Sequence, residues 1–205
     1  MKRSDITLHA RHRDKLQALL AHPRGHEGAA YMLLGKSEIA QDPWDLEPRT
    51  RYTSYEVIAI PQEDRVDAID KHVTWNTNSF AQLCRRAKEE GLVPAIVHSH
   101  PGGFDGFSDQ DDRNERDLFT MARNRNGEGT RLVSVVQVGD GLYRARVWED
   151  DMAPLPCHRV TVIGTRLEIQ STDVPTPSEA LARQALAFGP DVNGLLKQLS
   201  VAVVG

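Results

Sequence analysis

The chain has 205 residues, which suits one domain of ordinary size or one domain with part of a second. Hydrophobic residues make up 40% and charged residues 26%, a globular composition that excludes a disordered chain. The formal net charge of -4 gives no electrostatic reason to expect nucleic acid or an anionic membrane as a partner, and no apolar run is long enough to span a membrane. Only two cysteines occur, Cys84 and Cys157, which excludes a disulfide framework and an all-cysteine zinc site, and the chain is predicted to be cytoplasmic.

The N-terminal part is predicted to hold one helix and two strands. Leucines at helical spacing indicate a helix over residues 13–21, and the apolar run that follows Glu27 indicates a buried strand over 27–35. Residues 36–51 are polar and contain two prolines, so they are expected to form a loop. Alternating side chains over residues 52–60 then predict a second strand.

The middle of the chain is predicted to alternate helix, strand and helix. An amphipathic helix is expected over residues 78–90, followed by a short buried strand over 93–97 that leads directly into two histidines. After a glycine-rich loop, Ser108 is placed to cap a charged helix over residues 109–124. The chemistry-bearing residues therefore lie where a strand ends and a helix begins.

The remaining elements complete an α/β fold with a central, mostly antiparallel sheet flanked by helices. Four further strands are predicted, at residues 131–138, 142–149, 158–163 and 166–170. The composition then changes, and residues 173–177 are interpreted as a linker between a domain of residues 1–172 and a short segment of residues 178–205.

The sharpest motif is His98-x-His100, followed by seven residues and then Ser108-x-x-Asp111. Histidines at i and i+2 on a strand project from the same side, and Asp111 falls in the first turn of the next helix. Two imidazoles and one carboxylate are three ligands, a set that suits a catalytic zinc whose fourth position holds water. A lone histidine at a strand end is more often a satisfied polar residue, but all four residues at this spacing rarely arise by chance, which favours a metal site.

These residues resemble the JAMM motif of the JAB/MPN metalloproteases, in which HxH is followed at this spacing by a serine and an aspartate. That family also has a glutamate ahead of an apolar strand, a place that Glu27 matches. Glu38 and Glu47 compete but lie in polar loop sequence, and Glu56 lies within a strand of its own. The resemblance covers roughly residues 10–150 and implies the JAB/MPN fold, with its cytidine-deaminase-like architecture.

The resemblance implies a deubiquitinase-like zinc metallopeptidase. His98, His100 and Asp111 are expected to hold Zn2+. Glu27 is expected to accept a proton from the attacking water and deliver it to the departing amine. Ser108 is expected to hydrogen-bond the oxyanion of the tetrahedral intermediate.

The loop between His100 and Ser108 departs from the family pattern. It has Phe107 where a proline often precedes the serine, and Phe104 and Phe107 are expected to form a flap over a bound peptide tail. Residues 36–51 carry no signature of a particular ubiquitin linkage, so no chain selectivity is predicted.

The segment of residues 178–205 has a resemblance of its own. Its Arg-Gln and Phe-Gly pairs and its final apolar strand resemble the opening of the ThiF-type, ubiquitin-activating-enzyme-like fold. That likeness implies a protease joined to an adenylating domain, and hence a ubiquitin-like protein with a C-terminal glycine as substrate and partner. The chain stops at the first glycine of the expected nucleotide turn, so no nucleotide site is predicted.

Three other functions compete with this one. A peptidase that trims a ubiquitin-like sulfur carrier is the nearest alternative. A catalytically silent JAB/MPN scaffold or binding module serving a fused activating enzyme belongs to a different class, although such proteins usually lack a ligand that this chain retains. A role in DNA metabolism, as in the RadC-type relatives, is weakened by the acidic balance of charge and by the activator-like tail.

Overall fold

The description of the molecule rests on a computed structural model. The described residues are 3–21, 26–42, 46–61, 64–69, 72–75, 77–139, 141–150 and 152–171, together with the single positions Arg183 and Val203. The predicted linker and almost all of the ThiF-like segment therefore lie outside the described residues.

The described elements follow the predicted order, with four strands that the sequence pattern did not predict, one at the N-terminal end and three inside the chain. The helices are α1 (Ala10–Leu20), α2 (Thr77–Glu90) and α3 (Asp109–Asn126). The strands are β1 (Arg3–His9), β2 (Ala29–Ile39), β3 (Arg49–Ala59), β4 (Arg65–Ile69), β5 (His72–Trp75), β6 (Val93–His100), β7 (Leu132–Val138), β8 (Leu142–Trp148), β9 (Pro154–Pro156), β10 (Arg159–Ile163) and β11 (Leu167–Ser171).

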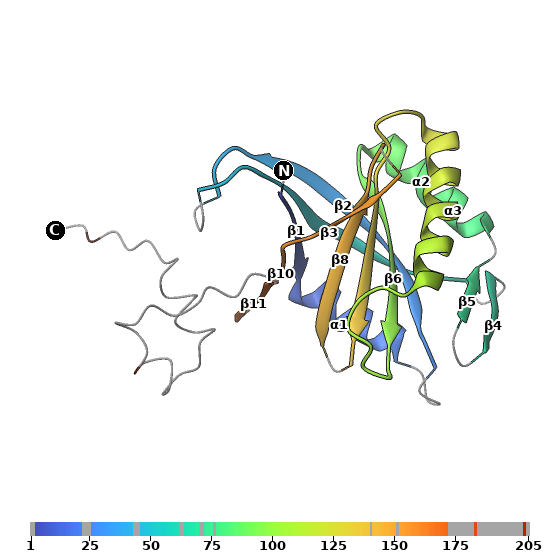
Figure 1. The fold of residues 1–205 in the computed structure, drawn as a ribbon, viewed down its shortest axis with the longest axis horizontal. Coiled ribbons are helices and arrows are strands. Elements are labelled where there is room, and N and C mark those ends of the chain that lie inside the picture. The colour runs from blue at the N-terminus through green and yellow to red at the C-terminus, as the bar shows by residue number, and fades with distance from the viewer. Residues whose placement is uncertain are drawn as a thin grey trace.

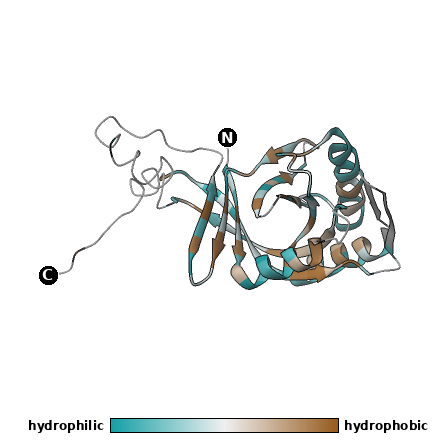
Figure 2. Ribbon diagram, turned by 90° about the horizontal axis from the view of Figure 1, so that it is seen from below, coloured by the Kyte–Doolittle hydropathy of each residue, from teal (hydrophilic) through white to brown (hydrophobic). Residues whose placement is uncertain are grey.

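Within the described residues, nine strands form one curved sheet in the order β11-β10-β1-β3-β2-β6-β7-β8-β9, and β4 and β5 form a separate hairpin (Figure 1). Five of the eight pairings in the large sheet are antiparallel, and the parallel ones are β1 with β10, β1 with β3 and β6 with β7. Figure 2 shows how strongly the sheet curls. The predicted α/β class, with a mostly antiparallel sheet flanked by helices, is confirmed.

Each face of the sheet has its own hydrophobic core. Met32 and Val97 belong to the core that Leu16 of α1 completes. Leu33, the next residue along β2, belongs to the opposite core with Phe80 of α2. Successive strand residues point to opposite faces, so a central strand covered by helices on both sides reads as one continuous apolar run.

The expectation of a loop over residues 36–51 is wrong at both ends, because β2 continues to Ile39 and β3 begins at Arg49. Strand β1, which the sequence pattern did not predict, pairs with β3 in parallel. Arg49 lies there between Asp5 and Asp42, and all three side chains are buried. Because buried ion pairs occupy interior positions, the apolar alternation that signals a strand is missing.

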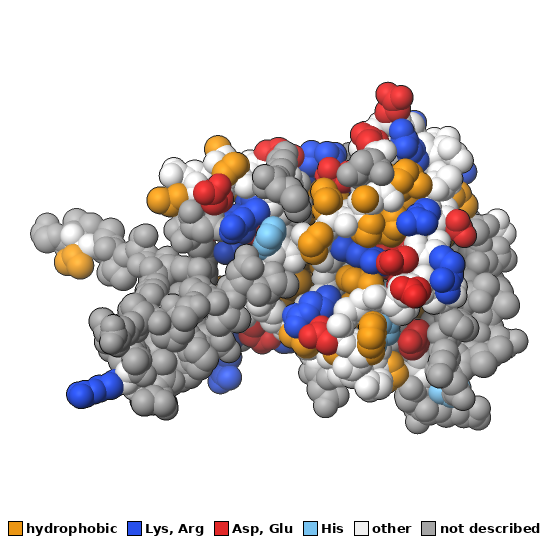
Figure 3. All heavy atoms as spheres, in the orientation of Figure 1, with side chains coloured by type: hydrophobic (Ala, Val, Ile, Leu, Met, Phe, Trp, Pro, Cys, Tyr) orange, Lys and Arg blue, Asp and Glu red, His pale blue; other side chains and the backbone are white. Residues whose placement is uncertain are grey.

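The surface has mixed character. On the face in Figure 3, acidic and basic side chains are interspersed with apolar ones, and no single-sign patch covers the described residues. This face therefore offers no extended basic surface for an anionic polymer. Among the helices that the structure describes, none combines the length and the apolar character needed to cross a membrane.

Candidate metal centre

Strand β6 brings two histidines into the middle of the sheet. It lies between β2 and β7, and its eight residues are all buried. His98 and His100 end this strand, are 5% and 6% exposed, and project from the same face. Their Nε2 atoms are 3.1 Å apart. A rigid, fully covered strand thus holds two imidazole nitrogens side by side.

Helix α3 supplies the third polar group through its N-terminal cap. Ser108 is the N-cap residue, and its Oγ accepts a hydrogen bond from the Asp111 N–H at 3.2 Å. The Asp111 Oδ2 in turn accepts from the Ser108 N–H at 2.7 Å and from the Ser108 hydroxyl at 2.8 Å. This capping box satisfies two N–H groups that a helix start leaves without partners. It also fixes the direction of the Asp111 carboxylate, which faces the histidines.

The three side chains form a donor set that could hold a metal ion. One ligand atom from each of His98, His100 and Asp111 can be chosen so that all lie within 4.8 Å of one another. Asp111 Oδ1 is 3.3 Å from His98 Nε2, and Asp111 Oδ2 is 3.6 Å from His100 Nε2. Zinc bonds of about 2.0–2.1 Å in a tetrahedral arrangement separate their ligand atoms by about 3.3–3.4 Å, so these spacings fit the ion.

The tautomer of His100 is set by a backbone carbonyl. His100 Nδ1 lies 3.1 Å from the Phe104 carbonyl oxygen, which can only accept, so Nδ1 carries the proton. In the neutral ring, Nε2 then has a lone pair directed toward the other two donors. Metal-binding histidines commonly donate their second ring N–H in this way.

The electrostatics of the cluster favour a bound cation. Burial raises the pKa of Asp111, but hydrogen bonds from His100, His98 and the Ser108 backbone outweigh it and hold that pKa well below the usual range of a carboxyl group. Burial lowers the pKa of His100, but its hydrogen bonds to Asp111 and to the Phe104 carbonyl outweigh it, and the net pKa is raised. The site therefore holds a carboxylate at neutral pH beside a histidine that binds a proton more readily than usual.

Glu27 lies at the rim of the cluster, with its Oε1 4.0 Å from His100 Nε2. It precedes β2, which pairs with β6 so that Ala29 lies opposite His98. Beyond that pair, the Ser99 N–H donates to the Gly28 carbonyl at 3.0 Å, and the Gly28 N–H donates to the Ser99 hydroxyl at 2.9 Å. The chain ahead of the strand is thus carried to the ligands, although Glu27 is more than 70 residues away from them in sequence.

The three competing glutamates have other surroundings. Glu38 Oε1 lies 2.8 Å from Lys36 Nζ, near the opposite end of β2. Glu56 Oε2 pairs with Arg86 Nη2 at 2.6 Å, and Glu47 is exposed in the loop before β3. Glu27, by contrast, lies beside a candidate ligand, His100. Its role as acid and base stays a prediction.

The prediction that Phe104 and Phe107 form a flap fits the position of Phe104 but not that of Phe107. Phe104 is 56% exposed and its ring lies 5.5 Å from that of His100, so it can cover this side of the site. Phe107 is half-buried, with its ring 6.2 Å from that of His98 and 3.9 Å from the Arg146 guanidinium carbon. Because Phe107 is wedged between these two groups, it forms a wall behind His98 rather than a flap.

A buried network that the sequence pattern did not predict lies behind this wall. Glu115 Oε2 accepts hydrogen bonds from Arg146 Nε and from Trp148 Nε1, both at 2.7 Å. Arg146 also pairs with Asp112, which follows the ligand Asp111 in sequence. The available signal was the pair of arginines at alternate positions of the otherwise apolar β8. Through Arg146, β8 supports both the loop and the first turn of α3.

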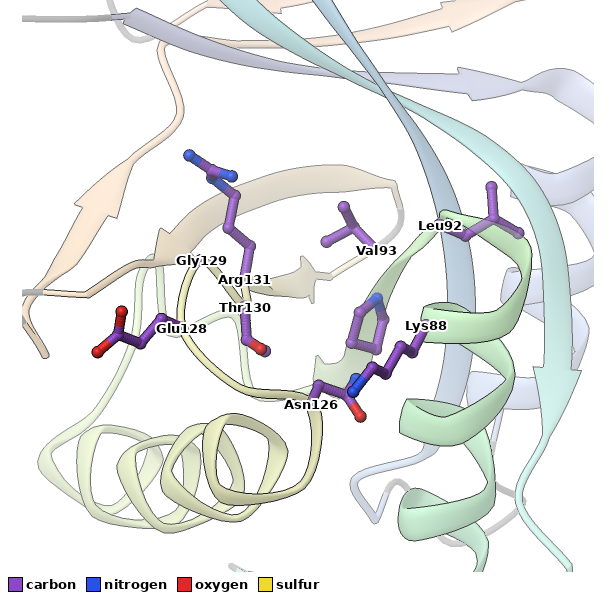
Figure 4. Close-up of a pocket in the computed structure, with 9 residues that line it drawn as sticks. Lys88, Leu92, Val93, Asn126, Glu128, Gly129, Thr130 and Arg131 are labelled. Atoms are coloured by element: carbon purple, nitrogen blue, oxygen red, sulfur yellow. The ribbon is translucent and has the colours of Figure 1, made fainter.

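A separate pocket of about 200 Å³ lies at the other end of β6 (Figure 4). Val93 begins that strand and lines the pocket, together with Lys88 of α2, Asn126 of α3 and Arg131. It contains none of the candidate metal ligands, because His98 and His100 lie at the other end of the strand and Asp111 lies in the first turn of α3.

Two solved structures resemble this chain only weakly. The solution structure of protein DSY2949 from Desulfitobacterium hafniense matches with a TM-score of 0.45 and 16% identity, over 77% of this chain and 92% of that one. The N-terminal domain of STIL from Trichoplax adhaerens matches with a TM-score of 0.30 and 11% identity, over 85% of this chain and 46% of that one. No curated protein matches the sequence.

The comparison with family models gives a clear result. The family described as prokaryotic homologs of the JAB domain, Prok-JAB, matches residues 9–150, a range that includes β2, β6, α3 and all the residues of the donor set. The match spans more than half of the chain and agrees with the curled sheet and its flanking helices. The chain therefore belongs to the prokaryotic JAB-domain family.

Proposed function

We propose that this chain is a zinc-dependent metallopeptidase of the JAMM type that cleaves after the C-terminal glycine of a ubiquitin-like protein. The observation that carries the proposal is the meeting of His98, His100 and Asp111 with the carboxylate of Glu27 at one strand end. Two histidines and one carboxylate leave a ligand position for water or substrate, as in catalytic rather than structural zinc sites. Membership of the JAB-domain family supports the same chemistry.

When bound to this donor set, a zinc ion supplies Lewis-acid polarisation of a carbonyl and lowers the pKa of water. His98, His100 and Asp111 are the residues that would hold it. Glu27, partly exposed at the rim, accepts the proton of the attacking water and passes it to the departing amine. Both tasks require a carboxylate at the open side of the site, where the Glu27 side chain is 23% exposed.

Ser108 stabilises the oxyanion in this proposal, which requires its hydroxyl to change partners. The hydroxyl proton is donated to Asp111 Oδ2, and a single proton cannot serve the oxyanion at the same time. Asp111 keeps the hydrogen bond from the Ser108 N–H when the hydroxyl turns away, so its orientation survives the change. Phe104 then covers the His100 side of the bound tail.

The proposed substrate and the proposed activating-enzyme domain rest on the resemblance of the sequence to the JAB/MPN and ThiF-type families. A ubiquitin-like protein with a C-terminal glycine is the substrate that a joined or associated activating-enzyme domain would share. The linker at 173–177 and the ThiF-like segment at 178–205 are part of this proposal. A cytoplasmic reaction is consistent with Cys84 and Cys157, which are both free thiols.

The competing proposal is a scaffold without catalytic activity. It predicts the same fold and tolerates loss of the metal. The discriminating experiment measures zinc content by mass spectrometry, and cleavage of a ubiquitin-like protein that carries either a C-terminal extension or a lysine-linked partner. We expect one zinc per chain and cleavage after the glycine, with Glu27→Gln retaining zinc and losing turnover, and Asp111→Ala losing both.

Each result separates the alternatives. Zinc binding without cleavage of either substrate would contradict the choice of substrate and would leave the metal centre intact. A purified chain that binds no zinc and cleaves nothing would overturn the metallopeptidase and leave the scaffold as the remaining proposal. A Glu27→Gln variant as active as the wild type would remove Glu27 from the mechanism.

A further inference from the structure

The loop between β6 and α3 has few constraints of its own. It comprises residues 101–107, of which 101–105 are exposed. Gly103 and Gly106 have φ values of 77° and 130°, and a Cβ at either would meet nothing within 4 Å. Packing at these two glycines therefore does not determine the course of the loop ahead of Phe107, and the glycines give it wide conformational freedom in the absence of specific contacts.

One part of this loop nevertheless requires accurate placement. The Phe104 carbonyl accepts the hydrogen bond from His100 Nδ1 that directs the Nε2 lone pair toward the other donors. The preceding contact, from the Gly103 N–H to the His100 carbonyl at 3.0 Å, is a local turn and leaves the next residues free to rotate. Something beyond the turn has to hold the carbonyl of Phe104.

The contact that restrains this part of the loop is an ion pair between the loop and the sheet. Asp105 follows Phe104, and its carboxylate lies 2.8 Å from Arg144 Nε and 2.9 Å from Arg144 Nη2, each through a different oxygen. Two parallel contacts of this kind fix the orientation of a carboxylate as well as its distance. The pair therefore restrains the peptide group immediately ahead of it.

The other end of the ion pair belongs to the same rigid frame as the ligands. Arg144 on β8 pairs with Val136 on β7, and Val136 pairs with His98 on β6. Cross-strand neighbours point to the same face, so Arg144 and His98 share one surface of the sheet two strands apart. A loop residue bound to Arg144 is thereby held at a set distance from the histidines.

We propose that Asp105 and Arg144 are a positioning pair for the metal centre, which hold the Phe104 carbonyl on His100 Nδ1 and so keep His100 as an Nε2 ligand. The inference rests on the proposed metal site and adds residues from a loop and a strand that contribute no ligand. Neither residue touches the reacting atoms, so their effect is on the affinity for the ion and on the orientation of one imidazole.

The partial exposure of the pair allows a clean test. Arg144 and Asp105 are 28% and 52% exposed, and exposed ion pairs contribute little to global stability. A matched control exists in Arg131, which directly precedes β7, and Glu149, which directly follows β8, at the ends of these strands away from the hairpin that joins them. Their side chains are 28% and 33% exposed and 2.7 Å apart. Removing either pair eliminates one partly exposed ion pair, but only the pair of Asp105 and Arg144 involves the loop.

The experiment measures the zinc dissociation constant by competition with a chromogenic chelator, for the full chain and for Arg144→Met, Asp105→Asn, their combination and Arg131→Met. We expect each single loop-pair variant to weaken zinc binding by about tenfold or more, the size usual for residues that orient a ligand. The double variant should be no weaker than the weaker single variant, because both remove one interaction. Arg131→Met should bind zinc as the wild type does.

A second readout reports on the imidazole itself. In the zinc-loaded wild type, the His100 Nδ1 proton should give a protected NMR resonance, and in Arg144→Met it should exchange with solvent. Wild-type affinity in both single variants would overturn the positioning role, as would an equal loss in Arg131→Met. A wild type that binds zinc but cleaves no substrate would contradict the proposed peptidase and leave this inference standing, whereas a wild type without zinc affinity would overturn both.

Discussion

The hydroxyl of Ser99 accepts a hydrogen bond from the N–H of Gly28, at the point where the ladder between β2 and β6 ends. In a regular antiparallel pair, that N–H would bond to a backbone carbonyl of β6. A side chain replaces the carbonyl here, so the chain leaves the ladder and carries Glu27 to 4.0 Å from His100 Nε2. Ser99 lies between the two histidines and thus connects the candidate base with the candidate ligands.

The first prediction concerns this contact. Ser99→Ala should lower the free energy of unfolding by about 1–3 kcal/mol, because a partly buried N–H loses its acceptor. It should also lower kcat on the proposed substrate by on the order of tenfold to a hundredfold, since Glu27 loses its restraint. Chemical denaturation and steady-state kinetics measure the two effects. Zinc stoichiometry should not change, and Ser99→Thr should restore activity; loss of zinc in Ser99→Ala would show that Ser99 supports the ligands instead.

The second prediction concerns the glycine of the same contact. A Cβ on Gly28 would collide with the Leu20 carbonyl oxygen and lie 2.6 Å from the Leu20 Cα, so the end of α1 would have to move. Gly28→Ala should cost at least about 2 kcal/mol of stability, measured by urea denaturation. Gly102→Ala is the control, because the same atom there meets nothing within 4 Å. Equal stability of the two variants would mean that the end of α1 can shift without loss of stability.

The third prediction concerns pH. The pKa of His100 is raised above its ordinary value of 6.5, and that of Asp111 is lowered below its ordinary value of 3.8. In the metal-free chain, the His100 contribution to stability is present below pH 6.5 and is lost as pH rises through its folded pKa. The Asp111 contribution is present above pH 3.8 and is lost as pH falls through its folded pKa. Stability from this pair should therefore be greatest between these limits.

At alkaline pH, the zinc affinity should rise while the stability contribution of His100 falls, because the ion competes with the proton on His100. The zinc affinity should increase as pH rises through the raised pKa of His100, with release of protons on binding. Calorimetry in buffers of different ionisation enthalpy measures that release. Binding that is independent of pH between 5.5 and about 8 would contradict protonation of His100 in the free site.

The fourth prediction concerns the buried charges that join β1 to the sheet. Asp5 is 1% exposed and accepts hydrogen bonds from Arg49 and from Arg159. Asp5→Ala should lower the free energy of unfolding by about 3–5 kcal/mol, because buried guanidinium groups lose a partner. The exposed pair of Arg13 and Asp14 provides the comparison, and Asp14→Ala should cost less than about 1 kcal/mol in the same urea denaturation. Similar losses in both variants would mean that the buried charges are rehydrated.

Much of the fold could be read from the pattern of side chains. Continuous apolar runs predicted β2 and β6 because both faces of these strands are buried. Strand β1 and the beginning of β3 escaped prediction because interior positions there hold Asp5 and Arg49 rather than apolar residues. The end of β2 escaped prediction because residues 36–39 are largely polar and not buried. An ion pair between segments remote in sequence leaves no periodic signal in either of them.

The sequence by itself determined the local part of the candidate centre. From His98 to Asp111 the chain forms a strand, a short loop and a capped helix start, and the spacing of the motif obliges these donors to meet because few residues separate them. The tertiary structure decided which groups surround them. Pairing of β2 with β6 brings Glu27 to the site, and the order of β6, β7 and β8 places Arg144 under the loop. Such neighbours depend on strand order and register, which arise from burial over the whole sheet and not from any short spacing along the chain.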